Sequence, residues 1–499
     1  MILVVVAAAI LALAVLSFTR NKKKSLKPVH PPGPPGLPFI GNLHQFDISK
    51  PHIYLWQLSK KYGPIMLMKL GIKQVIVISS ANIVKEVLKT QDQAFSGRPM
   101  VLGHQKLSYN GLDVAFAQYS DSWRELRKIY VVHLLSNKLV QSFRPVREDE
   151  IFSMIRNISR ISSTGQVANL SQIMLSLTSS LICRIAFGKK CDEEALGKRR
   201  FDELMIESQA VQGGFFVSDY LPSFGWVDKI SGMIDKVEKT YKDLDEFYQE
   251  LIEEHLDATR PKSAHPDILD LLIQLKEEHS CSIDFTWDHI KAALMDIFIA
   301  GTDTGAVAIV WTITALIKNP STMKKLQKEI RDMVGKKGHV NEEDLSNLPY
   351  LKAVIKEALG LYPPAPLLLP RETLQECTIG GYTIPNKALV YINAWAIARD
   401  PEYWESPEDF VPERFLNTNI DVVGKDFGVI PFGGGRRGCP GIAMGLATVE
   451  LALANLLYSF DWELPSGMTK EDVETDVLPG LTMHKKNALQ LVPKTYLCN

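Results

Sequence analysis

The segment 431–441, PFGGGRRGCPG, holds the residue types best suited to chemistry in this chain. Four glycines precede Cys439, and glycine lets the backbone turn tightly and approach a flat ligand. Pro440 suits the first position of a helix, and the apolar residues from Ile442 onward predict that helix. A cysteine there receives backbone N–H donors and the positive end of the helix dipole, while Arg437 can pair with a carboxylate. These are the requirements of a haem iron held by one cysteine thiolate.

Two other interpretations of this segment stay open. A lone cysteine is most often a small buried hydrophobic residue. Gly433, Gly435 and Gly438 also fit the dinucleotide-binding pattern G-x-G-x-x-G, with Asp461 about 20 residues further on. Too little chain follows Gly438 to complete a doubly wound sheet, and Pro431 interrupts the strand that should precede the glycines. A nicotinamide-dependent oxidoreductase is therefore the less favoured alternative.

A second polar group, made of Gly301, Asp303 and Thr304, lies inside a long apolar stretch over 290–317. Such residues can hydrogen-bond the nearby backbone and loosen a helix. In isolation they indicate a satisfied polar patch within a core helix. If they face a haem, Asp303 and Thr304 become candidate catalytic residues.

Composition limits what else this chain can be. It has 499 residues, 46% hydrophobic and 23% charged, which is a globular mixture able to bury a large core. The 56 Lys and Arg residues are balanced by 57 Asp and Glu residues, so no nucleic-acid partner is expected. Six cysteines without a C-x-x-C pair argue against a zinc ribbon or an iron–sulfur cluster.

Residues 1–19 predict a membrane anchor. The range 2–18 is apolar apart from Ser17, which is long enough for a transmembrane helix. A cleaved signal peptide is the alternative, but no basic residue precedes the apolar run. The basic cluster follows it instead, and the positive-inside rule then keeps the remaining chain in the cytosol.

Beyond the anchor, we expect a basic and proline-rich linker over 20–40 and one catalytic domain over 41–499. Alternating apolar residues predict a hairpin over 65–70 and 75–78, and a second strand pair over 379–384 and 388–392. Most other segments show helical periodicity. Examples are 233–257, 288–318, 320–334 and 442–458. The fold is therefore predicted to be mainly α with a minor β part, and 290–317 to be a core helix rather than a membrane span.

The chain resembles the cytochrome P-450 superfamily. Phe432, Gly435, Arg437, Cys439 and Gly441 match its haem-binding signature, F-x-x-G-x-R-x-C-x-G. Further family marks follow in order along essentially the whole chain, namely the proline-rich hinge, Trp123 with Arg127, AGTDT over 300–304, Glu357, and Pro412-Glu413-Arg414-Phe415. The resemblance implies the cytochrome P-450 fold with an N-terminal transmembrane helix, in a microsomal, plant-type member.

The resemblance also implies roles for individual residues. Cys439 would be the axial ligand of the haem iron, in a loop shaped by Phe432, Gly435 and Gly441. Thr304 would hold oxygen and a water, while Asp303 relays protons. The partners of the haem carboxylates would be Trp123, Arg127, Arg371 and Arg437. A mostly apolar substrate pocket would include Phe215, Phe216, Ile297, Ala300, Leu367, Leu368 and Met483, with a contribution from 480–484.

One position departs from the family pattern. The family expects Glu-x-x-Arg in the helix before Pro363-Pro364, but the chain reads Glu357-Ala358-Leu359-Gly360. In relatives this pair and the arginine equivalent to Arg414 form a buried charge network. Removing one partner of such a network can cost about 3–5 kcal/mol. Glu357 can still pair with Arg414, and water can fill the gap. The departure suggests weaker haem binding, so a weak or silent variant is the second alternative.

The activity implied by the resemblance is hydroxylation of a lipophilic small molecule, such as a terpenoid, phenylpropanoid or indole derivative. The cofactor would be haem b, iron protoporphyrin IX, with O2 as co-substrate. NADPH would act indirectly through a diflavin NADPH–cytochrome reductase. The protein would sit in the endoplasmic reticulum membrane with a single span, contacting lipid through the N-terminal helix, with its catalytic domain on the cytosolic face.

Overall fold

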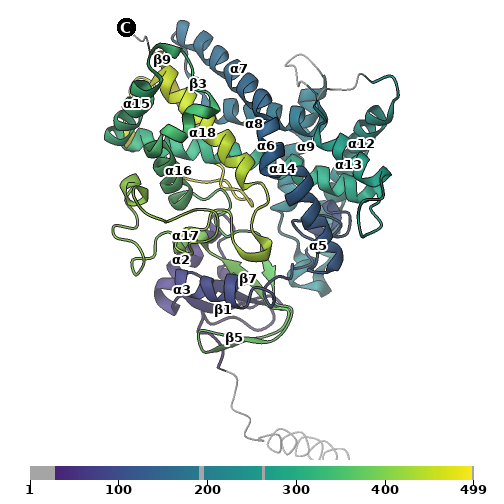
Figure 1. Ribbon diagram of the computed structural model, residues 1–499. Coiled ribbons are helices and arrows are strands. Elements are labelled where there is room, and N and C mark those ends of the chain that lie inside the picture. The colour runs from purple at the N-terminus through teal and green to yellow at the C-terminus, as the bar shows by residue number, and fades with distance from the viewer. Residues whose placement is uncertain (1–28, 190–195, 261–264, 497–499) are drawn as a thin grey trace, which may run out of the picture.

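The structure, a computed structural model, describes residues 29–189, 196–260 and 265–496 (Figure 1). The predicted anchor over 1–19 and the first part of the predicted linker lie outside these residues. The α-helices are α2 (Pro51–Tyr62), α3 (Ala81–Lys85), α4 (Leu102–Leu107), α5 (Asp121–Lys128), α6 (Asn137–Ser142), α7 (Arg144–Ser163), α8 (Leu170–Phe187), α9 (Leu196–Gln212), α10 (Val217–Tyr220), α11 (Trp226–Ile230), α12 (Met233–Leu256), α13 (Ile268–Glu277), α14 (Trp287–Lys318), α15 (Pro320–Val334), α16 (Pro349–Leu361), α17 (Ala394–Ile397) and α18 (Ile442–Ser459).

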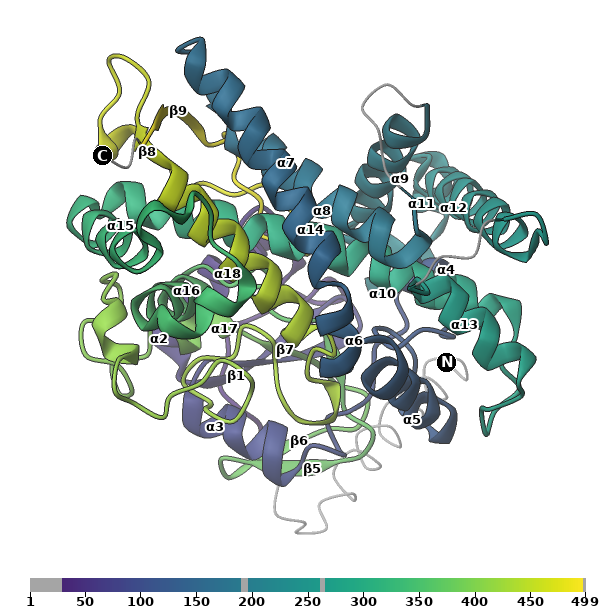
Figure 2. The same cartoon turned by 45° about the horizontal axis from the view of Figure 1, so that its top comes forward.

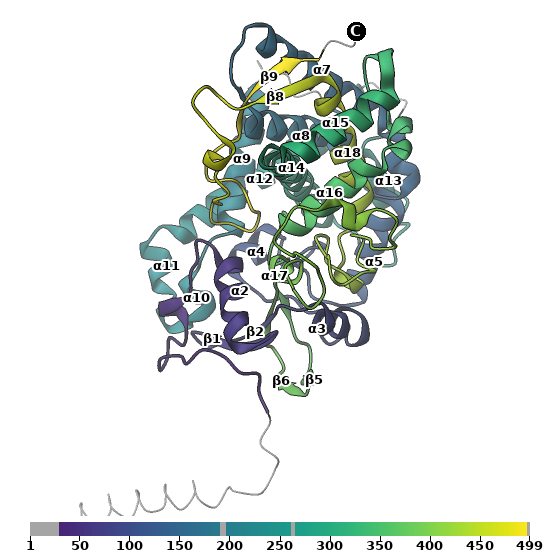
Figure 3. The ribbon, with the colours of Figure 1, turned by 90° about the vertical axis from the view of Figure 1, so that its left-hand side faces the viewer.

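Three small sheets accompany the helices. The first has the order β1-β2-β7-β4, from β1 (Ile65–Leu70), β2 (Lys73–Ile78), β7 (Leu389–Ile392) and β4 (Arg371–Glu372). The second has the order β3-β9-β8, from β3 (Ala168–Asn169), β9 (Gln490–Thr495) and β8 (Phe460–Glu463). The third pairs β5 (Cys377–Ile379) with β6 (Tyr382–Ile384). The four-stranded sheet lies with α2 and α3 at one end of the molecule, and most helices lie beyond it (Figures 1 and 3).

The predicted hairpin is confirmed, because β1 and β2 pair antiparallel from Ile65 opposite Ile78 to Leu70 opposite Lys73. The second predicted strand pair, over 379–384 and 388–392, is wrong. Gly380 and Gly381 both have positive φ and make a tight turn, so β5 and β6 pair with each other. β7 instead joins the larger sheet, parallel to β2 and antiparallel to β4.

The four helices that were predicted with explicit residue ranges are present as α12, α14, α15 and α18. Within the described part of the chain, α8, α14 and α18 are long and apolar enough to cross a membrane by length and composition. However, 61–67% of the residues in their most apolar windows are buried inside the protein. The prediction that 290–317 belongs to a core helix is therefore confirmed.

Helix α14 runs through the centre of the molecule (Figure 2). It starts where the Thr286 side chain accepts the His289 N–H, and it ends before Pro320, which has no N–H to continue the helix. Residues up to Ile299 pack in one apolar core with α12 and α13. Residues from Ala306 onward pack in a second core with α8, α16 and α18. The segment 300–305 belongs to neither core, so the most polar part of α14 lies where the packing is interrupted.

The described end of the proline-rich segment packs against β1. The Leu67 N–H donates to the Pro32 carbonyl at 2.9 Å. A side chain at Gly33 would place its Cβ only 1.8 Å from the Leu67 carbonyl oxygen, so only glycine allows this approach. The boundary between linker and catalytic domain at residue 40 stays a prediction.

Candidate active site

The interrupted part of α14 has an accessible face. Ala300, Gly301 and Thr304 are exposed although the helix on both sides is buried. The Thr304 hydroxyl donates to the Ala300 carbonyl at 2.8 Å, the back-bond that is expected of threonine within a helix. On the same helix, a Cβ at Gly301 would lie 2.5 Å from Ile182 Cδ1, so glycine is needed for the close contact with α8. The accessible face borders a hollow inside the protein.

Cys439 lies at the start of α18. Its N–H donates to the Phe432 carbonyl at 2.9 Å, and its sulfur accepts the Gly441 N–H at 3.3 Å. Burial raises the pKa of the Cys439 thiol above its usual 9.0, against the lowering effects of the Gly441 N–H and Arg127. The first residues of α18, over 442–447, are only half-buried, whereas most residues from Thr448 onward are buried. The free thiol therefore stands beside a second accessible helical face.

The glycines before the cysteine allow a close turn rather than a dinucleotide site. Gly435 has φ +66, and a Cβ there would lie 2.5 Å from Asp92 Oδ1 and 2.6 Å from the Leu88 carbonyl oxygen. No strand precedes Gly433 in this described segment, and Asp461 forms an ion pair with Arg331 at 2.9 Å. The nicotinamide alternative is therefore wrong, because the strand–turn–helix unit that it requires is not formed.

Three buried arginines lie close enough to lower one another's pKa, and we call Arg98, Arg371 and Arg437 the arginine cluster. Arg437 donates to the carbonyls of Ser96, Val114 and Ala117. Arg371 donates to the Gly434 carbonyl at 2.9 Å and to the Phe95 carbonyl at 3.4 Å. Arg98 donates to the carbonyls of Ala115, Leu369 and Pro370. The cluster is thus held mainly by neutral backbone oxygens.

Little negative charge balances the arginine cluster. Arg371 approaches Asp92 at 3.5 Å, but Asp92 also pairs with Arg436 at 2.9 Å. Arg98 and Arg437 form no ion pair with any described residue. Burial lowers the pKa of Arg437 to about 9 and that of Arg371 to about 10, and neighbouring arginines lower the pKa of Arg98 and Arg437 further. Asp113 is a nearby carboxyl that raises the pKa of Arg98 and Arg437, but burial and Asp296 raise its own pKa well above the usual value, so it offsets only part of the buried positive charge.

Trp123 and Arg127 both lie on α5 beside this cluster. The Trp123 Nε1–H donates to the Val114 carbonyl at 3.0 Å, and the Arg437 guanidinium lies 4.2 Å from the centre of the indole ring. Trp123 therefore supports Arg437 from one side. Arg127 makes no hydrogen bond or ion pair with the residues the structure describes, and it is close enough to lower the pKa of Cys439.

A cavity of about 180 Å³ opens between the four-stranded sheet, α4, α10 and the loop before β9. The predicted pocket residues that line it are Phe215, Phe216, Leu367, Leu368 and Met483. Ile297 and Ala300 do not line this cavity and lie on α14 instead. Leu368 has φ +54, which is an unfavourable backbone conformation for leucine. A turn in which the Leu368 N–H donates to the Ala365 carbonyl holds this conformation in place.

Asp303 lies on a buried face of α14, next to the accessible face in helical position. It is buried, and it contacts two residues of the loop 477–485 that also borders the cavity. The Thr482 hydroxyl donates to Asp303 Oδ2. His484 Nε2 lies 2.6 Å from Asp303 Oδ1, an ion-pair contact that is not aligned as a hydrogen bond.

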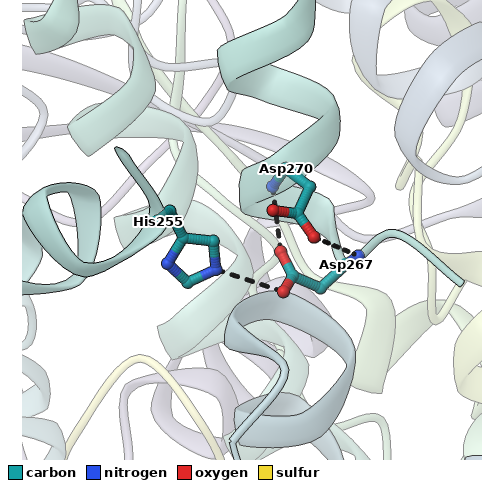
Figure 4. Close-up of side chains that lie close together, drawn as sticks. All are labelled: His255, Asp267 and Asp270. Atoms are coloured by element: carbon teal, nitrogen blue, oxygen red, sulfur yellow. Dashed lines mark hydrogen bonds and ion pairs between the residues drawn. The ribbon is translucent and has the colours of Figure 1, made fainter. Parts of the chain in front are cut away.

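One group elsewhere has the spacing of a metal site within the described ranges, namely His255, Asp267 and Asp270 (Figure 4). The Arg260 guanidinium already forms ion pairs with both carboxylates. Its nitrogens lie 2.8 Å from Asp267 Oδ2 and 2.6 Å from Asp270 Oδ1. The His255 ring also bonds the Leu251 carbonyl and Asp267. We interpret this group as a structural ion-pair cluster that caps α13.

Comparison with known proteins follows the same lines. A protein-family model described as Cytochrome P450 matches residues 31–492. The chain belongs to the cytochrome P450 family. It is 49% identical to 6,7,8-trihydroxycoumarin synthase from Pastinaca sativa over 92% of both chains, and 45% identical to strychnine-11-hydroxylase from Strychnos nux-vomica over 93% of this chain and 91% of that one. A solved zebrafish cytochrome P450 structure with progesterone has a TM-score of 0.77 and 26% identity, covering 89% of this chain and 99% of the other.

The cytochrome P450 fold, mainly helical with small sheets, is thus established, and so is monooxygenase activity. The cofactor of the family is haem b, with O2 and electrons that come from NADPH through a reductase.

The residues present fit that cofactor. Its two carboxylates would supply the negative charge that the arginine cluster lacks, and Cys439 would offer one free thiol to the iron.

The position where this P450 departs from the family pattern is partly compensated. Glu357 Oε2 lies 3.2 Å from Arg414 Nε, and Glu357 Oε1 accepts the Val411 N–H at 2.7 Å. A small cavity of about 10 Å³ beside Gly360 is lined by both of these charged residues. This volume is enough for about one water. Gly360 lies in the last turn of α16, so its cost to the helix is smaller than in a helix interior.

Sequence reasoning missed Arg98 and His484. Arg98 sits in the stretch FSGRP over 95–99, where a single arginine among small residues looks like a surface cation. His484 was included only as the end of a pocket segment, although it lies far from Asp303 along the chain. No local sequence pattern reports such a long-range contact.

Proposed function

We propose that Cys439 is the axial ligand of the haem iron and that the arginine cluster, with Arg127, holds the haem carboxylates. The observation that carries this proposal is that the buried guanidinium groups of Arg98 and Arg437 donate to backbone carbonyls and form no ion pair with a described residue. Burying an unpaired cation is costly unless a ligand supplies the opposite charge. In this arrangement Trp123 orients Arg437, while Phe432, Gly435 and Gly441 shape the loop around the sulfur.

When bound, haem supplies the oxidising power that inserts one atom of O2 into a C–H bond of the substrate. The chain contributes protons and exclusion of water. Thr304 has a hydroxyl on the accessible face of α14, where it can hold a water against the reacting oxygen. Asp303, one residue earlier, is placed to pass protons toward that water.

The substrate is proposed to be a lipophilic ring compound of specialised metabolism that enters through the cavity described above. The cavity lining supports this class, because aromatic and aliphatic side chains dominate it and Phe215 stacks on Tyr220 at 4.9 Å. The names of the relatives, which refer to trihydroxycoumarin, hydroxylated xanthotoxin and strychnine, support a phenylpropanoid or indole-type substrate more directly than a terpenoid.

The diflavin NADPH–cytochrome reductase is proposed to dock on the face formed by α5 and the loop that carries Cys439. Arg124, Lys128 and Arg436 present cations there, with side chains 61%, 59% and 46% exposed. Val131 and Val132 are exposed next to them. Arg124 and Lys128 pair with Asp121 and Glu125 on the same helix, and an acidic partner surface would compete for these exposed cations beside a small apolar area.

Membrane attachment is proposed at the opposite end, through the N-terminal anchor of an endoplasmic reticulum protein. Exposed apolar residues gather around α11 and the β1–β2 turn, which the hydrogen bond from Ile72 N–H to the Tyr220 carbonyl joins to α10 (Figure 3). They are Phe39, Ile72, Phe224, Trp226 and Ile230. A group of large apolar side chains exposed on the protein surface supports contact with membrane lipid at this place.

Turnover by the full-length protein tests this function. The protein is placed in lipid vesicles with a diflavin reductase, NADPH and O2, and lipophilic ring compounds are supplied as substrates. We expect a hydroxylated product that depends on the reductase. Absence of any oxygenated product across coumarin, terpenoid and indole substrates, in a preparation that retains haem, would contradict the proposal.

A second candidate function is that of a haem-binding member with weak turnover. It is favoured by the small cavity beside Gly360, where the family places an arginine. The two candidates differ in haem retention during turnover. A monooxygenase of ordinary strength keeps its haem, whereas the weak variant loses it while product formation slows.

A further inference from the structure

A buried face of α14, beside the accessible one, carries an unexpected charged contact. The Asp303 side chain is only 3% exposed, and both of its partners come from the loop 477–485. His484 lies 2.6 Å away and has a side chain that is 33% exposed. The buried carboxylate therefore has one partner that reaches water and can itself carry a proton.

The loop holds His484 in place independently of Asp303. The Trp311 Nε1–H donates to the Met483 carbonyl at 2.6 Å, and the Met483 N–H donates to the Pro364 carbonyl at 2.8 Å. Within the loop, the Leu478 N–H donates to the His484 carbonyl at 2.9 Å. These hydrogen bonds fix the backbone at Met483 and His484. The fold therefore holds the imidazole next to Asp303.

Other charged groups near the loop are engaged elsewhere. Lys485 donates to the Glu474 carbonyl and lies 4.8 Å from the centre of the Trp311 ring. Lys318 donates to the Val473 carbonyl at 3.1 Å, and Asp476 pairs with Lys50. Burial lowers the pKa of His484, but Asp303 raises it by more, so the net pKa lies above its usual 6.5. The charge of His484 is thus tied to Asp303.

We infer that His484 is the proton donor that reloads Asp303 during the oxygenation reaction. After a small rotation of the ring, the His484 Nε2–H bond breaks and an O–H bond forms on Asp303 Oδ1. The neutral imidazole then takes a proton from water at its accessible side. Thr482 holds the other carboxylate oxygen, which keeps Oδ1 directed at the imidazole. This inference rests on the proposed roles of Asp303 and Thr304.

The substitution His484→Gln separates proton transfer from positioning. Glutamine keeps an N–H donor for Asp303 but carries no exchangeable charge at neutral pH. We expect product formed per NADPH to fall about 10-fold or more, since a positioned general acid contributes about 10²–10⁴-fold. NADPH consumption should continue, with peroxide released instead.

In the wild type, product yield should fall as pH rises through the His484 pKa. In His484→Gln this pH dependence of product yield should disappear. His279→Gln, an exposed histidine on another surface, is the matched control.

A readout independent of turnover is the NMR titration of the histidines in the full-length protein. The signal that His484→Gln removes should titrate above 6.5 in the wild type and at a lower pH in Asp303→Asn. An unchanged titration in Asp303→Asn, or a His484→Gln enzyme with wild-type product yield and pH profile, would overturn the inference. If Thr304→Ala uncouples the enzyme while His484→Gln does not, the proposed function stands and only the role of His484 fails.

Discussion

Two buried groups of charged side chains in this P450 differ in how their charges are balanced. In the ion-pair cluster, whose His255, Asp267 and Asp270 are drawn in Figure 4, the Arg260 guanidinium pairs with both carboxylates and His255 Nε2 lies 3.1 Å from Asp267. In the arginine cluster, the guanidinium groups of Arg98 and Arg437 meet only backbone carbonyls. The first group stabilises the fold by itself. The second is complete only when a ligand brings negative charge, and such an imbalance marks a functional site better than burial alone.

The pKa values follow this difference. His255 and Arg260 lower the pKa of Asp267 although burial opposes them. Burial and neighbouring arginines lower the pKa of Arg437 to about 9. In the ion-pair cluster the neighbours favour the charged form of Asp267, whereas at Arg437 the neighbouring arginines disfavour the charged form and Asp113 and Asp92 offset them only in part.

The largest expected effect comes from removing one cation from each group. Arg437→Met should weaken haem binding by about 3–5 kcal/mol, roughly two to four orders of magnitude in affinity, because a haem carboxylate loses its partner. The same change should raise the melting temperature of the haem-free protein, since it relieves repulsion within the cluster. Haem titration and calorimetry of the two forms measure both effects.

Arg260→Met is the matched control for that pair of measurements. It should lower the melting temperature with and without haem by the same amount, because Asp267 and Asp270 lose a partner far from the cofactor. If Arg437→Met destabilises the haem-free protein as Arg260→Met does, the two groups are not different in kind.

A smaller effect is expected at Glu357. Its charge is only partly balanced, because it pairs with Arg414 but lacks the arginine that the family has at position 360. Gly360→Arg combined with Val429→Ala should increase haem retention several-fold, because it restores a cation beside Glu357. The valine must shrink, since a Cβ at position 360 would lie 3.3 Å from Val429 Cγ2. Gly360→Ala with the same second change controls for helix propensity. Equal haem loss rates in the two double variants would show that the missing arginine does not weaken haem binding.

The smallest effect is a pH dependence of stability that has opposite signs at Glu357 and at Asp267 of the ion-pair cluster. Burial raises the pKa of Glu357 to about 7, so its contribution to stability is present below 4.5 and is lost as pH rises toward 7. Asp267 has a lowered pKa, so its contribution is present above 3.8 and is lost as pH falls further. Glu357→Gln should therefore flatten the melting temperature between pH 4.5 and 7 by about 1–2 °C. An unchanged slope in that range would be evidence against the raised pKa.

The sequence predicted these features unequally. Periodicity located α12, α14, α15 and α18, because long amphipathic or apolar helices repeat one signal over many residues. The short strands β5 and β6 were misplaced, since the Gly380-Gly381 turn was not recognised. The motif around Cys439 was readable because its residues are adjacent in sequence. Arg98 and His484 were not, because their meaning depends on contacts between segments far apart in the chain.

The reduced carbon monoxide difference spectrum tests the central claim most directly, namely that the thiolate of Cys439 completes the site prepared by the arginine cluster. The wild-type protein should show a Soret band shifted strongly to the red, as expected of thiolate-ligated haem. Cys377→Ser, which changes another free thiol, should keep that band, and Cys439→Ser should lose it together with turnover. A Cys439→Ser protein with the same spectrum and the same product yield as the wild type would contradict the account.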